Sequence, residues 1–375
     1  MKEIWRYIKD EVNLIYRDKG MFLLVVIALP LYTLIYSLAY GSEVVRNVPI
    51  AIVDDDNSSE SRSLIKRFAT GPGTMVNYKA SNMQEAQELF YSKKISGIVY
   101  IPHGFESSIM AGREANIGLI LDGSHLLLYR QVLEQITKST LQHGAMVELS
   151  RLIKRDIDPS TAKFIIEPIA INIDNVYNDT LGYGTFVMPS VVMVIIQQTL
   201  LIGLAMAGAQ RDNKKRITAK YIIAKVLVYT IIYGINLIFI LGLIWNIFGF
   251  ANIGNTLHVT LFLILYIISA LSLAMLFSQL FHKRESPLML LLWSSVPVLL
   301  LAGVSYPREA FPEWLFDIGR LLPSSSGVNG FIALASRGAT LSEIREEVFT
   351  LAILTIIYIT LTIFINKTKI NKANF

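Results

Sequence analysis

The 375-residue chain contains no cysteine, which excludes disulfides and thiol-based redox or zinc chemistry. It also lacks a G-x-x-x-x-G-K-[ST] run, so it has no phosphate-cradling loop of its own. Its histidines show no zinc-ligand spacing. We find no convergent set of acid, base or metal-binding side chains, which argues against an enzyme. The sequence therefore predicts no catalytic, metal or cofactor site in this chain.

Charge is scarce in six long apolar stretches, none of which carries an acidic or basic side chain at its middle. Each is about 17–25 residues long, enough for a helix to cross about 30 Å of hydrocarbon. Only helices satisfy every backbone polar group within such a segment. The pattern predicts a polytopic α-helical membrane protein with six transmembrane helices, at 21–40, 184–209, 221–249, 257–281, 287–306 and 347–366. The first stretch is too long for a signal-peptide core and lacks a cleavage site, so we expect it to remain.

Lysine and arginine cluster in four of the segments that flank these apolar stretches. They lie in 1–20, in 210–220, in the short link at 283–284 and in the tail 367–375. The positive-inside rule assigns basic segments to the cytoplasm. Six spans with both termini inside satisfy all four at once. The protein is therefore expected in the cytoplasmic (inner) membrane, with residues 41–183 and 307–346 outside, and the basic residues predict contact with lipid rather than nucleic acid.

The segment 41–183 has a different composition and predicts an inserted extracytoplasmic α/β domain. Short apolar runs at 49–53, 97–101 and 117–121 are typical of strands, and 165–173 is expected to be extended. Helical patterns cover 58–68, 83–91, 105–110 and 126–153. Alternation of this kind is typical of a compact domain built around a small sheet.

The acidic run that follows the first expected strand invites a metal interpretation. Asp54, Asp56 and Ser58 have the spacing of early ligands in a calcium loop. The glycine and the distal glutamate of an EF-hand are missing, however. A strand end that leads into a helix cap is the better interpretation.

Two segments beside the spans have patterns of their own. Residues 1–20 predict an amphipathic helix on the inner surface, because apolar side chains recur at helical spacing and charges occupy other faces. Residues 307–346 are rich in aromatic and apolar side chains interrupted by Pro323, which predicts two short re-entrant helices. Trp314 lies in the first of them.

Polar residues inside the spans have two interpretations. Gln197, Gln198, Asn236, Ser294 and Ser295 could form hydrogen bonds between helices, or could line a translocation path. For the path hypothesis the candidates are Gln197, Gln198, Ser294, Ser295, Trp314 and Pro323. Lys225 is near a cytoplasmic end and is expected to extend its amine toward water.

Several short motifs, in order and on this topology, resemble one family. Residues 49–54 (PIAIVD), 101–105 (IPHGF, similar to I-P-x-G-F), 121–124 (LDGS) and 301–314 (LAGVSYPREAFPEW) carry the similarity, followed by Pro323. The chain resembles the permease subunits of type II ABC exporters (the ABC-2 type), in the branch with a large extracytoplasmic domain between the first two spans.

The resemblance implies a function and partners. It implies a dimer with a second copy or a paralogous permease, a separate cytoplasmic ATPase that binds ATP and Mg²⁺, and export of a substrate across the inner membrane. A periplasmic adaptor and an outer-membrane channel are further candidate partners. Such permeases carry an R-E-x-G-T-x-E-x-L-like stretch where the ATPase docks. Here only Arg211 and Asp212 match it in part.

The ATPase-coupling hypothesis names residues of the first amphipathic helix and of the first cytoplasmic loop. They are Trp5, Ile8, Val12, Arg211, Asp212, Lys215 and Arg216. In the alternative interpretation of this loop, it is only a topological anchor. In the alternative interpretation of the whole chain, it is a membrane-anchored receptor or scaffold whose external domain binds a ligand or partner.

Overall fold

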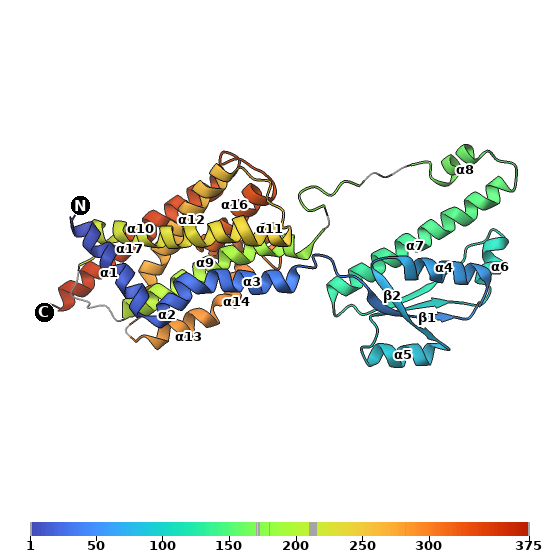
Figure 1. Ribbon diagram of the computed structural model, residues 1–375, viewed down its shortest axis with the longest axis horizontal. Coiled ribbons are helices and arrows are strands. Elements are labelled where there is room, and N and C mark those ends of the chain that lie inside the picture. The colour runs from blue at the N-terminus through green and yellow to red at the C-terminus, as the bar shows by residue number, and fades with distance from the viewer. Residues whose placement is uncertain are drawn as a thin grey trace. The chain divides into compact units, whose positions relative to one another are not determined.

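The computed structural model describes residues 2–169, 171, 173–179, 181–209, 216–281 and 283–373. The chain forms two compact units. The membrane unit consists of Met1–Glu43 and Asn175–Phe375, and the inserted unit consists of Val44–Asp174 (Figure 1).

Five helices in the described part of the chain are long and apolar enough to cross a membrane. They run over Lys19–Tyr40, Tyr183–Ala209, Ala219–Phe248, Thr256–Phe277 and Arg345–Asn371. By element they are α2 (Lys19–Phe22) with the π-helical turn η1 (Leu23–Ile27) and α3 (Ala28–Tyr40); α9 (Tyr183–Ala209); α10 (Ala219–Phe239) with η2 (Ile240–Ile244) and α11 (Trp245–Phe248); α12 (Thr256–Phe277); and α17 (Arg345–Ala373). This is the architecture of a helical membrane protein.

The stretch predicted as the fifth span forms two shorter helices. These are α13 (Glu285–Trp293) and α14 (Ser295–Leu301), and the helix is interrupted at Ser294. The hydroxyls of Ser294 and Ser295 donate to the carbonyls three residues earlier, at 2.9 and 2.6 Å, and so satisfy backbone acceptors beside the break. The sequence predicted six spans. The described residues form five helices of spanning length, and the pair α13 and α14 occupies the position of the predicted fifth span.

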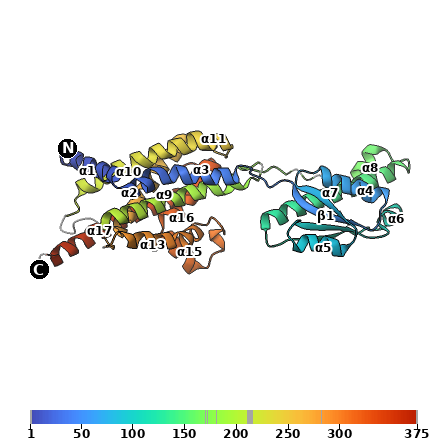
Figure 2. The ribbon, with the colours of Figure 1, turned by 60° about the horizontal axis from the view of Figure 1, so that its bottom comes forward.

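Helix α9 lies in the middle of the membrane unit. Most of its side chains are buried, on all faces of the helix. It packs against α3, α12 and α13, and Figure 2 shows it between α3 and the α13 region. A helix that is apolar and buried all round is a core helix, so the other membrane helices are arranged around α9.

The outer helices expose apolar side chains along their length. Exposed side chains on α3, α10 and α17 include Leu31, Ile35, Leu38, Ile231, Ile235, Ile238, Phe349, Ile353, Ile356 and Phe364. Exposed apolar surface of this extent is unfavourable in water and suits the hydrocarbon of a bilayer.

Between α14 and α17 the chain forms two short helices. A 3₁₀ turn, η3 (Arg308–Ala310), leads into α15 (Glu313–Arg320), and α16 (Pro323–Phe331) continues into the π-helical turn η4 (Ile332–Ser336). Helix α16 is buried and packs against α9, α12 and α17. Glycine permits this close approach, because a Cβ at Gly327 would lie 2.3 Å from the ring of Tyr266.

The N-terminal helix α1 (Lys2–Arg17) packs against α10. Its buried residues are Glu11 and Ile15, while Ile4 and Ile8 on the same stripe are half-buried. Asp18 then caps α2 by accepting the N–H groups of Gly20 and Met21, at 3.0 and 3.1 Å. The amphipathic pattern of this segment therefore places one face of α1 on the helix bundle.

The inserted unit contains a four-stranded sheet in the order β2-β1-β3-β4. The strands are β1 (Val48–Asp54), β2 (Thr74–Ala80), β3 (Gly97–Ile101) and β4 (Gly118–Leu121). The first three pair in parallel and β4 is antiparallel to β3. The helices are α4 (Ser59–Thr70), α5 (Met83–Tyr91), α6 (Phe105–Met110), α7 (Leu126–Ile153) and α8 (Pro159–Ile166).

Strand alternation gives this sheet two apolar faces. Ile50 and Ile52 join the cluster under α4 and α7, while Ala51 and Val53 face the opposite side with Ala86 of α5. Because helices cover both faces of the sheet, the sequence of β1 is a continuous apolar run rather than an alternating one. Two details differ from the sequence expectation: β2 was not foreseen, and the run predicted as extended at 165–173 begins with the end of α8.

Candidate functional site

A buried polar contact joins α9 to the start of α16. Pro323 occupies the first turn of α16, whose early N–H groups have no partner within the helix. The amide oxygen of Gln197, which is fully buried, accepts the Ser324 N–H at 2.7 Å. Two of the residues named in the path hypothesis, Gln197 and Pro323, are thus brought together by the fold.

Hydrogen-bonding capacity remains unused on α9 and at the start of α16. The Gln197 amide nitrogen, both amide atoms of Gln198 and the Ser324 hydroxyl are buried, and none has a partner among the residues that the structure describes. Leaving such groups unpaired costs about 1–3 kcal/mol each. These unpaired polar groups of α9 and α16, which we call the polar seam, lie inside an apolar bundle.

The other residues of the path hypothesis lie elsewhere. Ser294 and Ser295 are half-buried and bond to carbonyls of their own helix, and Trp314 on α15 is 65% exposed. Among the described contacts, none of the three bonds to the polar seam. Asn236, by contrast, donates to the Val25 carbonyl at 3.5 Å and so links α10 to η1.

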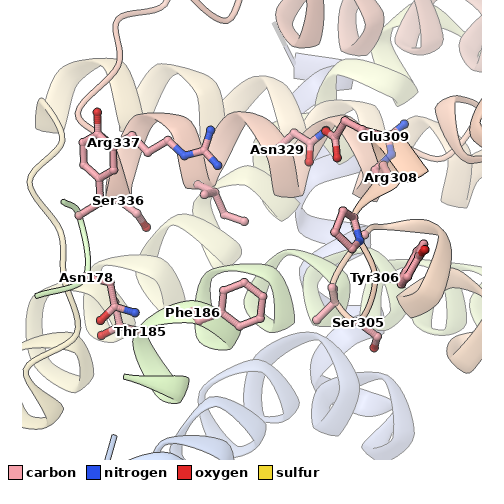
Figure 3. Close-up of a pocket in the computed structure, with 15 residues that line it drawn as sticks. Asn178, Thr185, Phe186, Ser305, Tyr306, Arg308, Glu309, Asn329, Ser336 and Arg337 are labelled. Atoms are coloured by element: carbon pink, nitrogen blue, oxygen red, sulfur yellow. The ribbon is translucent and has the colours of Figure 1, made fainter. Parts of the chain in front are cut away.

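A cavity of about 340 Å³ opens beside η3, α16 and the start of α9. Figure 3 shows Arg308 and Glu309 on one side of it and Arg337 on the other, with Phe186 of α9 between them. Arg308 is only 5% exposed although arginine is rarely buried. Sequence reasoning missed this site: it predicted re-entrant helices in 307–346, but nothing in the sequence shows that Arg308 is buried or that Arg308 and Arg337 line one cavity.

Arg308 is held by packing more than by hydrogen bonds. Its guanidinium lies 4.9 Å from the centre of the Phe316 ring, and Nη1 donates to the Ser325 carbonyl at 3.3 Å. Gly303 has φ +82°, and a Cβ there would lie 2.6 Å from Arg308 Cγ. Burial lowers the pKa of this guanidinium, but arginine remains charged at any physiological pH.

The described residues of the coupling hypothesis lie on α1 and just before α10, at one end of the helix bundle. Trp5 and Val12 are exposed on α1, and Ile8 is half-buried against the bundle. Arg211, Asp212 and Lys215 lie outside the described residues. Arg216 is exposed and lines a cavity of about 830 Å³, together with residues of α1, α9, α10 and α12.

The structure reveals a charged cluster at this end that sequence reasoning did not find. Glu11 of α1 accepts hydrogen bonds from the Lys225 amine and, at 2.8 Å, from the Tyr229 hydroxyl. Lys225 is buried in this pair, so the expectation that it extends toward water is wrong. The signal was present, since Glu11 occupies the apolar stripe of α1 beside Ile8 and Ile15.

Two further ion pairs fasten the same segment. Glu3 pairs with Lys220 at the surface, and Asp18 pairs with Arg284 at 2.5 Å. The N-terminal segment is therefore tied to α10 and to the link before α13 at three points along its length.

The acidic run of the inserted unit acts as a set of backbone caps. Asp56 accepts the N–H groups of Gly104, Phe105 and Glu106 at 2.8–3.0 Å and so holds the start of α6. Burial acts to raise the pKa of Asp56, but hydrogen bonds from Ser58 and these backbone groups outweigh it and lower the pKa. In the described residues no group of three acidic or histidine side chains could hold a metal.

Comparison with known proteins identifies relatives over most of the chain. The profile of the family described as "ABC-2 family transporter protein" matches residues 19–364. The chain is 22% identical to the "Probable multidrug ABC transporter permease YbhR" of Escherichia coli K12, over 85% of this chain and 86% of that protein. It is 21% identical to the "Linearmycin resistance permease protein LnrN" of Bacillus subtilis 168, over 92% of this chain and 94% of that protein.

One solved structure shares part of the sequence. It is the crystal structure of a domain assigned to an ABC type-2 transporter from Thermotoga maritima, 24% identical over 33% of this chain and 81% of that domain. The TM-score is 0.25, too low to establish a common fold.

Proposed function

Since the chain belongs to the ABC-2 family of transporter proteins, we propose that it is the permease subunit of an ATP-driven exporter, supplying the path by which a substrate leaves the cytoplasm. The observation that carries this proposal is the family match, which covers both the membrane helices and the inserted unit. The names of the two relatives, a multidrug permease and a linearmycin resistance permease, favour a small organic molecule as cargo.

The energy comes from a separate subunit in this proposal. The sequence has no phosphate-cradling loop, so ATP and Mg²⁺ bind to a partner ATPase. The permease acts as a dimer, with a second copy or a paralogue, as the family implies. It lies in the inner membrane with both termini in the cytoplasm and the inserted unit outside, because the basic segments flank the cytoplasmic ends.

Coupling takes place at the inner ends of α1 and α10. The ATPase contacts α1 and the loop at 210–216, and the ion pairs of α1 transmit the resulting displacement to α10. The polar seam at Gln197, Gln198 and Ser324 lies on the core helix α9 and on α16, where a change in helix packing alters access to unpaired polar groups. A periplasmic adaptor and an outer-membrane channel complete the route in cells with two membranes.

The coupling step is tested with the ATPase partner in liposomes. Changing Arg211, Lys215 and Arg216 to Gln together should lower substrate-stimulated ATP hydrolysis while membrane insertion is retained. The control changes three exposed lysines of the inserted unit, Lys66, Lys79 and Lys94, to Gln. It removes the same charge from the chain and should leave hydrolysis unchanged.

Topology is tested by introducing single cysteines. Because the natural sequence contains no cysteine, each introduced thiol is the only site that a thiol reagent can label. Cysteines at Ser81 and Asn213 should react with an impermeant thiol reagent from opposite sides of the membrane. Labelling of both from one side would refute the topology. If no ATPase binds and the inserted unit alone captures a ligand, the receptor interpretation replaces the exporter.

A further inference from the structure

The cavity beside η3 contains a positive charge with no ionic partner. Arg308 has no carboxylate within ion-pair distance among the residues that the structure describes, although Glu309 and Glu347 act on it from farther away. Within the part of the chain that the structure describes, one of its five N–H donors has an acceptor, at the long distance of 3.3 Å, and its buried Nε has none. A buried charge left in this state is costly.

A second unpaired polar group lines the same cavity. The Ser336 hydroxyl at the end of η4 is buried and has no partner in the described part of the chain. Arg337, the next residue, also lines the cavity and is exposed. Glu309 is the one acidic side chain among the 15 residues that line this space, so the lining carries one net positive charge.

The rest of the wall is largely apolar or aromatic. Phe186 of α9, Tyr306, Val304 and Ile332 contribute to it, and Tyr306 stacks on Phe311 with ring centres 6.0 Å apart. The volume of about 340 Å³ falls at the lower end of the range of about 300–1,000 Å³ for small-molecule sites. An apolar wall with a few convergent polar groups is the usual composition of such sites.

From this geometry we infer that the cavity binds an organic anion, with a carboxylate, sulfonate or phosphate group on Arg308 and an aromatic or short aliphatic body against Phe186 and Tyr306. The fork of the Arg308 guanidinium matches the two oxygens of such a group. On the side of the cavity opposite Arg308, the Ser336 hydroxyl donates to a polar atom of the body, and Arg337 contributes attraction from the exposed rim (Figure 3). This inference deepens the proposed function, on which it rests, by naming the class of molecule that the permease carries or senses.

The test uses the purified full-length chain in phosphatidylcholine nanodiscs and two fluorescent probes. 8-Anilinonaphthalene-1-sulfonate carries the anionic group, and N-phenyl-1-naphthylamine has the same ring skeleton without it. Fluorescence of empty nanodiscs is subtracted. The wild-type chain should bind the sulfonate saturably, and Arg308→Gln should weaken that binding at least about tenfold while leaving the neutral probe unchanged.

Arg320 provides a matched control. It is exposed on α15 and its guanidinium lies 5.7 Å from the centre of the same Phe316 ring, but it does not line the cavity. Arg320→Gln should leave both probes unchanged. Equal sulfonate binding by wild type and folded Arg308→Gln would overturn the inference. So would an equal loss of both probes, which would mean that the wall and not the charge binds them.

Two milder variants keep the test decisive if Arg308→Gln does not fold. Ser336→Ala removes one hydroxyl, and Arg337→Gln removes an exposed charge. Each should weaken binding of the sulfonate severalfold with an unchanged melting temperature. If neither does, the inference fails.

The anion could be a free solute or a lipid headgroup, and nanodiscs with phosphatidylglycerol distinguish them. Phosphatidylglycerol that occupies the cavity should lower the affinity for the sulfonate, relative to phosphatidylcholine nanodiscs, in wild type and Arg320→Gln but not in Arg308→Gln. That result identifies the headgroup as the occupant. An equal loss in all three reflects surface charge alone and identifies a free organic anion. No ATP or ATPase is present in these measurements. A chain that binds the anion but never transports therefore refutes the proposed function and leaves the site standing.

Discussion

Glu11 of α1 and Lys225 of α10 form a buried ion pair although 214 residues separate them in the sequence. The Tyr229 hydroxyl donates to the same carboxylate oxygen as Lys225. Both charged side chains are less than 10% exposed, so the pair is protected from screening by salt. An amphipathic helix that could otherwise lie free on the membrane surface is thereby fixed to a spanning helix.

Removing one partner of this pair should destabilise the membrane unit. Lys225→Met leaves Glu11 buried without its cation, and breaking a buried pair in this way costs about 3–5 kcal/mol. We expect a lower melting temperature in detergent and weaker ATPase stimulation. The double variant Glu11→Gln/Lys225→Met should recover much of the loss, because no buried charge remains. A double variant as unstable as the single one would contradict this account, and Glu3→Gln at the exposed pair should change little.

Neighbouring glutamines on α9 should respond differently to the same substitution. Gln197→Leu removes the acceptor of the Ser324 N–H and should cost about 1–3 kcal/mol, because that donor is left buried and unpaired. Gln198→Leu removes an amide that has no partner, so stability should be unchanged or higher. If the polar seam belongs to the path, Gln198→Leu should nevertheless lower transport. Melting curves and transport assays on the two variants separate these roles.

Contact between α16 and α12 should be intolerant of even one added methyl group. In Gly327→Ala the new Cβ would meet Tyr266, whose hydroxyl donates to the Met193 carbonyl and which is fully buried. Overpacking of this kind costs about 1–3 kcal/mol. Gly234 on α10 has open space around it, so Gly234→Ala is the matched control and should be tolerated. The yield of monodisperse protein and its melting temperature measure both.

Acid should weaken the start of α6 through Asp56. The folded pKa of this carboxyl lies below the unfolded value of 3.8, so its contribution is complete above about pH 4 and is lost as the pH falls through the lowered pKa. At neutral pH, Asp56→Ala should cost about 1–2 kcal/mol, as loss of a helix cap does. Hydrogen exchange at Gly104, Phe105 and Glu106 should accelerate in that variant. Unchanged exchange there would show that the cap contributes nothing.

Segments whose signal is local were predictable from the sequence. β1 and β3 are continuous apolar runs because helices cover both faces of the sheet. The stretches that form α9, α12 and the part of α10 after Lys225 are long and uncharged. β2 escaped because it is an edge strand with exposed Met75 and Tyr78, and it is recognised only through its pairing with β1. The broken helix at Ser294 is apolar on both sides, so hydropathy alone cannot place the interruption.

The candidate sites depended on contacts between distant segments. Gln197 and Pro323 stood out because a polar or helix-breaking residue in an apolar run is conspicuous. Arg308 did not, because nothing in its neighbouring sequence signals that an arginine there is buried, and its burial results from packing against Gly303 and Phe316. The glutamate in the apolar stripe of α1 was a signal that Glu11 is buried, but only the fold shows that its partner is Lys225.

Glu43, the last residue before the inserted unit, has its backbone carbonyl 2.8 Å from the Tyr183 N–H, and its carboxylate accepts the backbone N–H and the hydroxyl of Thr185. The segments that lead out of the membrane unit and back into it are thus hydrogen-bonded to each other. Joining Glu43 directly to the start of α9 adds little loop entropy because these two ends already touch, so a short turn could replace residues 44–182 without moving α3 or α9. In this sense the inserted unit is a module that can be exchanged: its size can change while the long apolar helices keep their own arrangement.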